Sequence, residues 1–162
     1  SIEAGRVHIS PRDVDVRGLL DARLAAWQTR APYRDLKKKV AGGLPHVHVD
    51  PTWLAKALDE LIDNAVKYAP TGPVTLTASL SPDGEHVRVT VKDAGPGISA
   101  EDEARLFTSF EQVDGSATRR VGGLGLGLSF VRRIADDAGF PLSVLPTDGK
   151  GAEFALDLPI AP

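Results

Sequence analysis

Glycines are concentrated in the segment "VGGLGLGLSF" at residues 121–130, where the chain runs into an apolar pattern typical of a helix. Glycines before a helix let backbone N–H groups approach an anion, and the helix N-terminus adds a partial positive charge. The segment therefore indicates a phosphate-binding loop, although a flexible hinge or a close contact between helix and sheet explains the same glycines. A Walker A loop is excluded because no Gly-Lys-Ser/Thr follows, and a Rossmann fingerprint fits poorly because no strand leads directly into the glycines.

A polar stripe is predicted in "DELIDNAVKYAP" at residues 59–70. Glu60, Asn64 and Lys67 are spaced by four and three residues, which places them on one face of a helix. An amide oxygen such as that of Asn64 can ligate Mg²⁺, and a lysine such as Lys67 can neutralise phosphate oxygens. A solvated helix face gives the same pattern, so the stripe alone does not define a site.

The segment "DAGPG" at residues 93–97 follows a strand-like stretch. Asp93 can accept hydrogen bonds from an exocyclic amine, while Gly95 and Gly97 let the backbone come close to a ring. An ordinary turn after a strand is the alternative explanation. Phe107 and Phe110 in "LFTSFEQVD" are three residues apart, a spacing that is more often core than functional.

The elements that must position these residues alternate along the chain. Helical spacing predicts helices at residues 16–30, 51–68, 101–107 and 126–138, and alternation predicts strands at 5–9, 36–40, 46–49, 73–80, 86–93, 141–145 and 152–158. Asp15 and Asp50 precede the first two helices as N-caps, and Pro51 suits the first helical position. The long polar loop at 108–123 is expected to be a lid or a binding loop.

Composition limits the classes of protein that fit. The chain has 162 residues, 42% of them hydrophobic, which suits one globular domain. Its 19 basic and 22 acidic residues give a net charge of -3, so no field of one sign favours nucleic acid or direct membrane contact. The absence of cysteine excludes disulfides and thiolate metal sites. Because methionine is also absent, we expect a fragment or a processed product.

Together these segments resemble the catalytic and ATP-binding domain of bacterial sensor histidine kinases, a branch of the superfamily that also holds gyrase, Hsp90 and MutL ATPases. The motifs follow the family's order: an N box in "ELIDNAVKY", a G1 box in "DAGPG", an F box in "LFTSF" and a G2 box in "GGLGLGLSFV". The resemblance implies the α+β class and a two-layer α/β sandwich of the Bergerat type. We expect a mixed sheet of about five strands with three main helices on one face.

The resemblance also implies a domain boundary. The opening "SIEAGR" resembles the last turn of the dimerisation helix that precedes this domain in intact kinases. Residues 1–10 are therefore expected to be a remnant of that helix and its linker. Residues 11–162 are expected to form the catalytic and ATP-binding domain.

Cofactor roles follow from the resemblance, residue by residue. Asp93 would hold the adenine amino group, Gly95 and Gly97 would shape the adenine pocket, and Tyr68 would line the base and ribose. The residues implied for the phosphates are Lys67 on the helix and Arg119, Arg120, Gly123, Leu124, Gly125, Leu126 and Gly127 in or beside the lid. Phe107 and Phe110 would anchor that lid and face the partner domain.

The metal and the catalytic steps are assigned to the N box. Asn64 would coordinate Mg²⁺, and catalytic roles are implied for Glu60, Asn64 and Lys67. Glu60 departs from the family pattern, which commonly has a second asparagine. In gyrase-like relatives a glutamate there activates water, so Glu60 either promotes ATP hydrolysis or contacts Mg²⁺ through water. Leu124 also departs, because a threonine or serine is usual at its place.

The function implied is binding of Mg-ATP and transfer of its γ-phosphate to a histidine on a separate dimerisation domain. The partners implied are that domain and a response regulator. The isolated chain is expected to be a monomer located in the cytoplasm. If the parent kinase is membrane-bound, the chain would belong to its cytoplasmic part. His8, His46, His48 and His86 lack the surroundings of a phosphoacceptor, so the chain is expected to bind ATP without autophosphorylation. The alternatives are a gyrase- or Hsp90-like ATPase, a serine-kinase anti-sigma factor and a degenerate nucleotide-binding interaction module.

Overall fold

A five-stranded mixed sheet forms one layer of the domain, in the order β4-β6-β7-β9-β8. The strands are β4 (Asp35–Val40), β6 (Pro73–Leu80), β7 (His86–Lys92), β9 (Glu153–Pro159) and β8 (Leu142–Leu145). β4 is parallel to β6, and the remaining neighbours are antiparallel. The computed structural model describes residues 2–3, 6–106 and 123–162, with side chains from residue 8 to 104 and from 128 onward.

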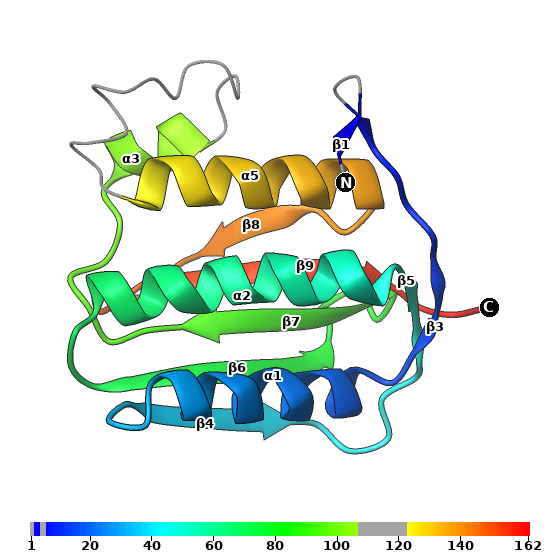
Figure 1. Ribbon diagram of the computed structural model, residues 1–162, viewed down its shortest axis with the longest axis horizontal. Coiled ribbons are helices and arrows are strands. Elements are labelled where there is room, and N and C mark those ends of the chain that lie inside the picture. Colours follow the sequence, from blue (N-terminus) through cyan, green and yellow to red (C-terminus); the bar gives the residue numbers. More distant parts are fainter. Residues whose placement is uncertain (1, 4–5, 107–122) are drawn as a thin grey trace.

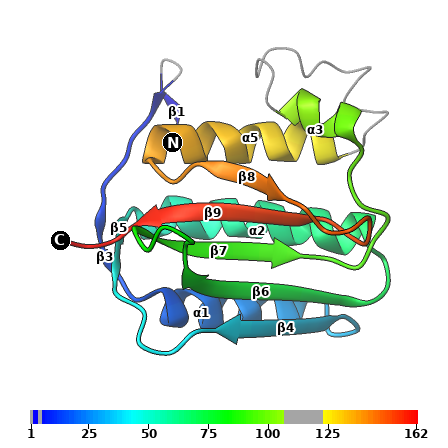
Figure 2. The same cartoon turned by 180° about the vertical axis from the view of Figure 1, so that it is seen from behind.

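Helices form the second layer. α1 (Val16–Arg30), α2 (Pro51–Tyr68) and α5 (Gly123–Ala138) lie over one face of the sheet, with α2 in the middle (Figure 1). Seen from behind, the strands lie in front, and none of the described helices covers their outer face (Figure 2). The shorter α3 (Ala100–Leu106) lies beside α5. This arrangement confirms the predicted α+β sandwich. Within the described ranges, no helix is both long and apolar enough to cross a membrane.

The helix starts follow the predicted caps, with one shift. The Oδ1 atom of Asp50 accepts hydrogen bonds from the N–H groups of Thr52 (2.9 Å) and Trp53 (3.3 Å) at the start of α2. Asp15 caps α1 in the same way. α5 begins at Gly123, before the predicted start at residue 126. Part of the glycine-rich segment is therefore helical.

Asp50 also joins the N-terminal segment to α2, because its Oδ2 accepts the N–H of Ser10 at 2.8 Å. The residue is buried. Alanine would leave the N–H groups of Ser10, Thr52 and Trp53 without this acceptor, so Asp50→Ala should lower the free energy of unfolding by about 2 to 3 kcal/mol in urea denaturation. The exposed cap variant Asp15→Ala is the control, with an expected cost of about 1 kcal/mol. Equal losses in the two variants would contradict this account.

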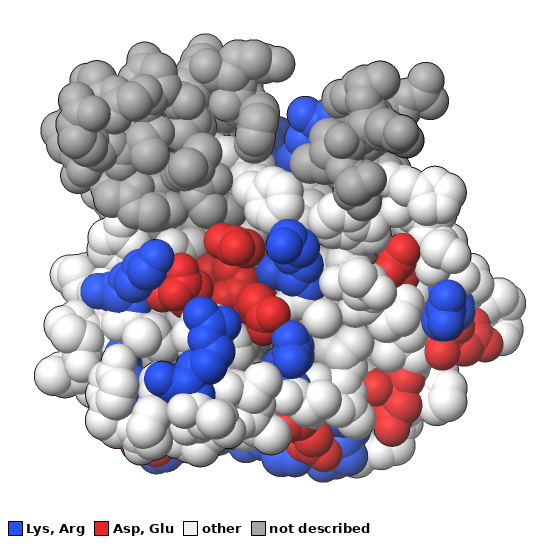
Figure 3. Space-filling model, in the orientation of Figure 1, with Lys and Arg blue, Asp and Glu red and all other residues white. Residues whose placement is uncertain are grey.

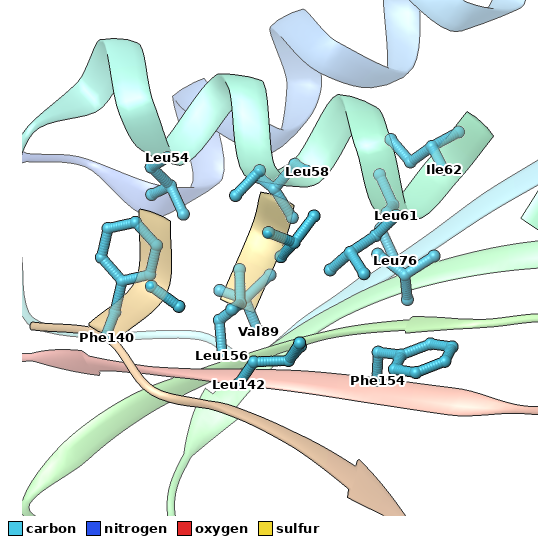
Figure 4. Close-up of a cluster of buried hydrophobic side chains, with 14 of the residues drawn as sticks. Leu54, Leu58, Leu61, Ile62, Leu76, Val89, Phe140, Leu142, Phe154 and Leu156 are labelled. Atoms are coloured by element: carbon cyan, nitrogen blue, oxygen red, sulfur yellow. The ribbon is translucent and has the colours of Figure 1, made fainter. Parts of the chain in front are cut away.

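The core lies between α2 and the sheet (Figure 4). Leu54, Leu58 and Leu61 of α2 are buried and point from the helix toward the sheet, where Val89 and Leu156 are also buried. Alternate residues of β6, β7 and β9 face the helices, and those buried are Val74, Leu76, Ala78, Val87, Val89, Val91, Phe154, Leu156 and Leu158. Burial on this face fixes α2 against the sheet, so the main chain of the polar residues on its other faces also has a fixed position.

The first residues differ from the prediction. β1 (Ile2–Glu3) and β2 (Arg6–Val7) pair antiparallel, where the resemblance implied the last turn of a helix. A single helical turn fixes the backbone of several residues for few hydrogen bonds, whereas in a strand pair the backbone groups of each strand hydrogen-bond to those of the other. The strand predicted at 5–9 is shorter in the structure. The boundary between residues 1–10 and 11–162 stays a prediction.

A second small sheet holds the next segment against α2. β3 (Arg12–Val14) pairs antiparallel with β5 (Val47–Val49), which directly precedes α2. The Trp53 indole Nε1–H donates to the carbonyl of His8 at 2.8 Å. The strands predicted at 36–40 and 46–49 therefore both form, but they belong to different sheets.

Candidate functional site

Asp93 follows β7 directly and opens the loop of residues 93–97, here called the Asp93 loop. Its Oδ1 accepts hydrogen bonds from the N–H groups of Gly95 (2.9 Å) and Ala152 (3.1 Å). The Asp93 N–H donates to the Ala152 carbonyl at 2.9 Å. Within the described part of the chain, Oδ2 receives no hydrogen bond. The carboxylate is thus fixed through one oxygen, and the other can accept from a ligand.

Gly151, next to Ala152, lets the turn before β9 lie directly on the Asp93 loop. Its N–H donates to the Gly95 carbonyl at 2.9 Å. Gly151 has φ +73°, and a Cβ atom there would lie 1.9 Å from the Asp93 carbonyl oxygen. Sequence reasoning did not identify Gly151 or Ala152 as part of the site. The sequence signal that could have identified them was Gly151, the second glycine in "DGKGAEF", which comes directly before the last predicted strand.

The C-terminus of α2 contacts the other side of the Asp93 loop. A Cβ atom at Gly95 would lie 2.9 Å from the Ala69 Cβ and 3.0 Å from the Tyr68 carbonyl oxygen. Gly97 has φ +89°, which favours glycine, and its Cα faces the Gly151 carbonyl. The structure thus places the Tyr68 main chain, Gly95 and Gly97 beside Asp93, and the nucleotide-binding roles of these residues stay predictions.

Asn64 lies on the same helix and is buried, with 5% of its surface exposed. Among the described residues, its side-chain Nδ2 is the buried polar atom without a hydrogen-bond partner. Buried polar groups are nearly always hydrogen-bonded, because an unpaired group loses its hydration without compensation. An orphaned amide at this depth is therefore consistent with a side chain that meets a bound ligand.

Lys67 and Glu60 are less buried than Asn64. The Lys67 side chain is 58% exposed and pairs with Asp63, with 2.9 Å between Nζ and Oδ2. The hydrogen bond to Asp63 and its negative charge raise the pKa of Lys67, so the ammonium is charged at neutral pH. Glu60 is half-buried, and its carboxylate makes no hydrogen bond to another described residue. The predicted stripe exists, although Lys67 takes Asp63 as a partner that sequence reasoning did not name.

The predicted lid falls mostly outside the described residues. This applies to Phe107, Phe110, Arg119 and Arg120. The residues of the predicted phosphate-binding segment that are described form the first turns of α5, and they are Gly123, Leu124, Gly125, Leu126 and Gly127. In an α-helix the first N–H groups have no acceptor within the helix.

Charges around α2 are mixed. Basic and acidic side chains are interspersed over the helix-covered face (Figure 3), where Arg23 pairs with Asp59 and Lys67 with Asp63. A cavity of about 650 Å³ on the helix-free side of the sheet also borders Asp93 and is lined by Thr75 and Lys92 among others. None of the α2 residues lines that cavity, so it is distinct from the place where Tyr68 and Ala69 contact the Asp93 loop.

Residues 49–162 match the family described as histidine kinase-, DNA gyrase B-, and HSP90-like ATPases. The virulence sensor protein BvgS of Bordetella bronchiseptica is 35% identical over 97% of this chain and 13% of its own length. The sensor protein GacS of Pseudomonas syringae pv. syringae is 32% identical, over 97% of this chain and 18% of its own. The sensor-like histidine kinase SenX3 of Mycobacterium tuberculosis is 32% identical over 91% of this chain and 36% of its own length. The chain thus spans between 13% and 36% of these relatives.

Solved structures share the fold. Full-length ShkA, crystallised in complex with AMPPNP, superposes with a TM-score of 0.76 at 34% identity, covering 96% of this chain and 32% of ShkA. The catalytic domain of the histidine kinase ThkA gives 0.77 at 21% identity, covering 94% of this chain and 99% of that domain, and shows the fold alone. With the family match over residues 49–162, these similarities establish that the chain belongs to the histidine kinase-, DNA gyrase B-, and HSP90-like ATPases and is a histidine kinase catalytic domain.

Proposed function

We propose that the chain binds Mg-ATP beside the Asp93 loop and donates the γ-phosphate to a histidine on a separate dimerisation domain. The observation that carries the proposal is the Asp93 carboxylate, anchored through Oδ1 by Gly95 and Ala152 with Oδ2 left to accept. The adenine amino group is a donor and fits that acceptor, whereas the guanine carbonyl at the corresponding place is itself an acceptor. The site should therefore select adenine over guanine.

Asn64 suits the metal end of the site. The amide oxygen of Asn64 is a ligand that Mg²⁺ accepts, and its buried Nδ2, which has no hydrogen-bond partner among the described residues, would donate to a phosphate oxygen of the nucleotide. When bound, Mg²⁺ would neutralise charge on the phosphate oxygens. Glu60 precedes Asn64 by one helical turn and would contact the ion through water.

The phosphate end would be held by Lys67 and by the N-terminus of α5. Lys67 is charged and largely exposed, so it can turn from Asp63 toward a phosphate at little cost. The first N–H groups of α5, from Gly123 onward, are donors without an intrahelical acceptor. Phosphoryl transfer depends mainly on such positioning and charge neutralisation. In the transfer, a histidine ring nitrogen forms a bond to the γ-phosphorus. The bond between the γ-phosphorus and the β,γ-bridging oxygen breaks, and ADP leaves with that oxygen.

The nucleophile would come from the dimerisation domain of an intact kinase, and a response regulator would receive the phosphoryl group from it. SenX3 is named as a sensor-like histidine kinase, which supports this placement. We propose that the chain works in the cytoplasm, where ATP is present, and that alone it is a monomer that binds ATP without autophosphorylation.

Calorimetric titration with ADP and AMPPNP, with and without Mg²⁺, tests the proposed binding. We expect saturable binding of both nucleotides in the micromolar range, and no binding of GDP. A folded protein that binds neither adenine nucleotide would contradict the proposal and favour a degenerate interaction module.

Asn64→Ala tests the metal end separately. Loss of a ligand should weaken AMPPNP binding in the presence of Mg²⁺ by about tenfold or more. ADP binding in EDTA is the internal control and should stay at the unsubstituted value, because the adenine contacts are unchanged. A Mg²⁺-dependent gain in affinity equal to that of the unsubstituted chain would show that Asn64 does not hold the ion.

A further inference from the structure

Arg34 is a buried cation that the proposed chemistry does not use. It lies between α1 and β4 and is 6% exposed. Its guanidinium donates to main-chain carbonyl oxygens: from Nη1 to Val66 at 2.9 Å, and from Nη2 to Ala69 at 2.5 Å and Gly72 at 3.3 Å. Within the described ranges, no carboxylate pairs with it.

This placement suits the end of a helix. The last carbonyl groups of a helix have no intrahelical donor and carry the negative end of the helix dipole. Arg34 satisfies the Val66 and Ala69 carbonyls at the end of α2, and through Gly72 it also holds the chain that leads into β6. A planar guanidinium with its donors in a fixed fork sets the relative positions of several acceptors at once.

The segment that Arg34 holds is the surface on which the Asp93 loop lies. Gly95 packs against the Tyr68 carbonyl and Ala69, and a Cβ atom at Gly72 would lie 2.8 Å from the Ala94 Cβ. A shift of the α2 C-terminus would therefore move the loop that carries Asp93. It would also change the distance between that loop and Asn64.

We propose that Arg34 is a positioning residue for the adenine site: it fixes the C-terminus of α2 so that the Asp93 loop and the α2 side chains face one nucleotide. The inference rests on the proposed function. If Arg34 were only stabilising, its substitution would lower the free energy of unfolding without changing nucleotide affinity in the folded protein.

The test compares Arg34→Met and Arg34→Lys with Arg88→Met. Arg88 forms an ion pair with Asp157 on the helix-free face, so its loss removes a half-buried arginine away from the Asp93 loop. ADP affinity is measured by calorimetry at a temperature where circular dichroism shows every variant to be folded. Amide hydrogen exchange of Gly95 and Gly151 reports the loop directly, because their N–H groups donate to Asp93 and Gly95.

We expect Arg34→Met to weaken ADP binding roughly ten- to hundredfold and to speed exchange at Gly95 and Gly151. Arg34→Lys should restore part of the affinity, because an ammonium still donates to carbonyls, and Arg88→Met should bind as the unsubstituted chain does. ADP binding unchanged in folded Arg34→Met, or lost equally in Arg88→Met, would overturn the inference. If the unsubstituted chain fails to bind ADP, the proposed function fails, and the exchange rates at Gly95 and Gly151 alone decide the role of Arg34.

Discussion

Asp93→Asn is expected to weaken ADP binding by about a hundredfold or more while the protein stays folded. In the native loop, Oδ1 accepts two backbone N–H groups, from Gly95 and Ala152, and Oδ2 is left for the ligand. An asparagine keeps the shape but has only one acceptor oxygen. If that oxygen faces Gly95 and Ala152, the amide NH₂ meets the adenine amino group, donor against donor. The opposite rotamer places the NH₂ against the backbone donors instead.

Calorimetry with ADP measures this loss, and Asp157→Asn is the matched control. Asp157 carries a carboxylate that is paired with Arg88 and lies away from the Asp93 loop. Its amide variant should bind ADP normally. Retention of ADP affinity in Asp93→Asn would show that the adenine amino group is not read by this carboxylate.

Gly151→Ala is expected to lower the free energy of unfolding by roughly 3 to 5 kcal/mol. The left-handed backbone at φ +73° strains any L side chain, and the new Cβ atom would lie 1.9 Å from the Asp93 carbonyl oxygen. That atom is main chain, so it cannot rotate away. Relief requires separation of the turn before β9 from the Asp93 loop, and nucleotide affinity should fall with stability.

Gly149→Ala separates strain from contact in the same turn. Gly149 has φ +77°, and a Cβ atom there would meet nothing within 4 Å. Because only the left-handed strain remains, Gly149→Ala should lower the free energy of unfolding by about 1 to 2 kcal/mol and leave ADP affinity unchanged. Both variants are measured by urea denaturation and calorimetry. Equal losses of stability would contradict the contact between Gly151 and the Asp93 loop.

Local signals predicted most of the framework. Asp50 and Pro51 mark the start of α2, and an apolar face runs along it, so its bounds at Pro51–Tyr68 are confirmed. The hairpin of β6 and β7 is confirmed with alternating burial. These elements depend on caps, turns and periodicity within a few residues, which a sequence shows directly.

Contacts between distant segments were harder to predict from the sequence. The hydrogen bond from Ala152 to Asp93 and the contact of Gly151 join residues far apart in the chain, and nothing in either segment alone indicates the other. The bonds from Arg34 to α2 are hidden for the same reason. In contrast, the pairing of Lys67 with Asp63 has the ordinary i,i+4 spacing and was available from the sequence.

The most direct test of the account is a titration of the isotope-labelled chain with ADP, followed by amide NMR spectra. We predict saturable shifts at the Gly95 and Gly97 amides and at the Asn64 side-chain NH₂, with none on addition of GDP. This result would locate an adenine site between α2 and the Asp93 loop. Shifts confined to residues around the cavity of the helix-free face, such as Thr75 and Lys92, or an unchanged spectrum of the folded protein, would contradict it.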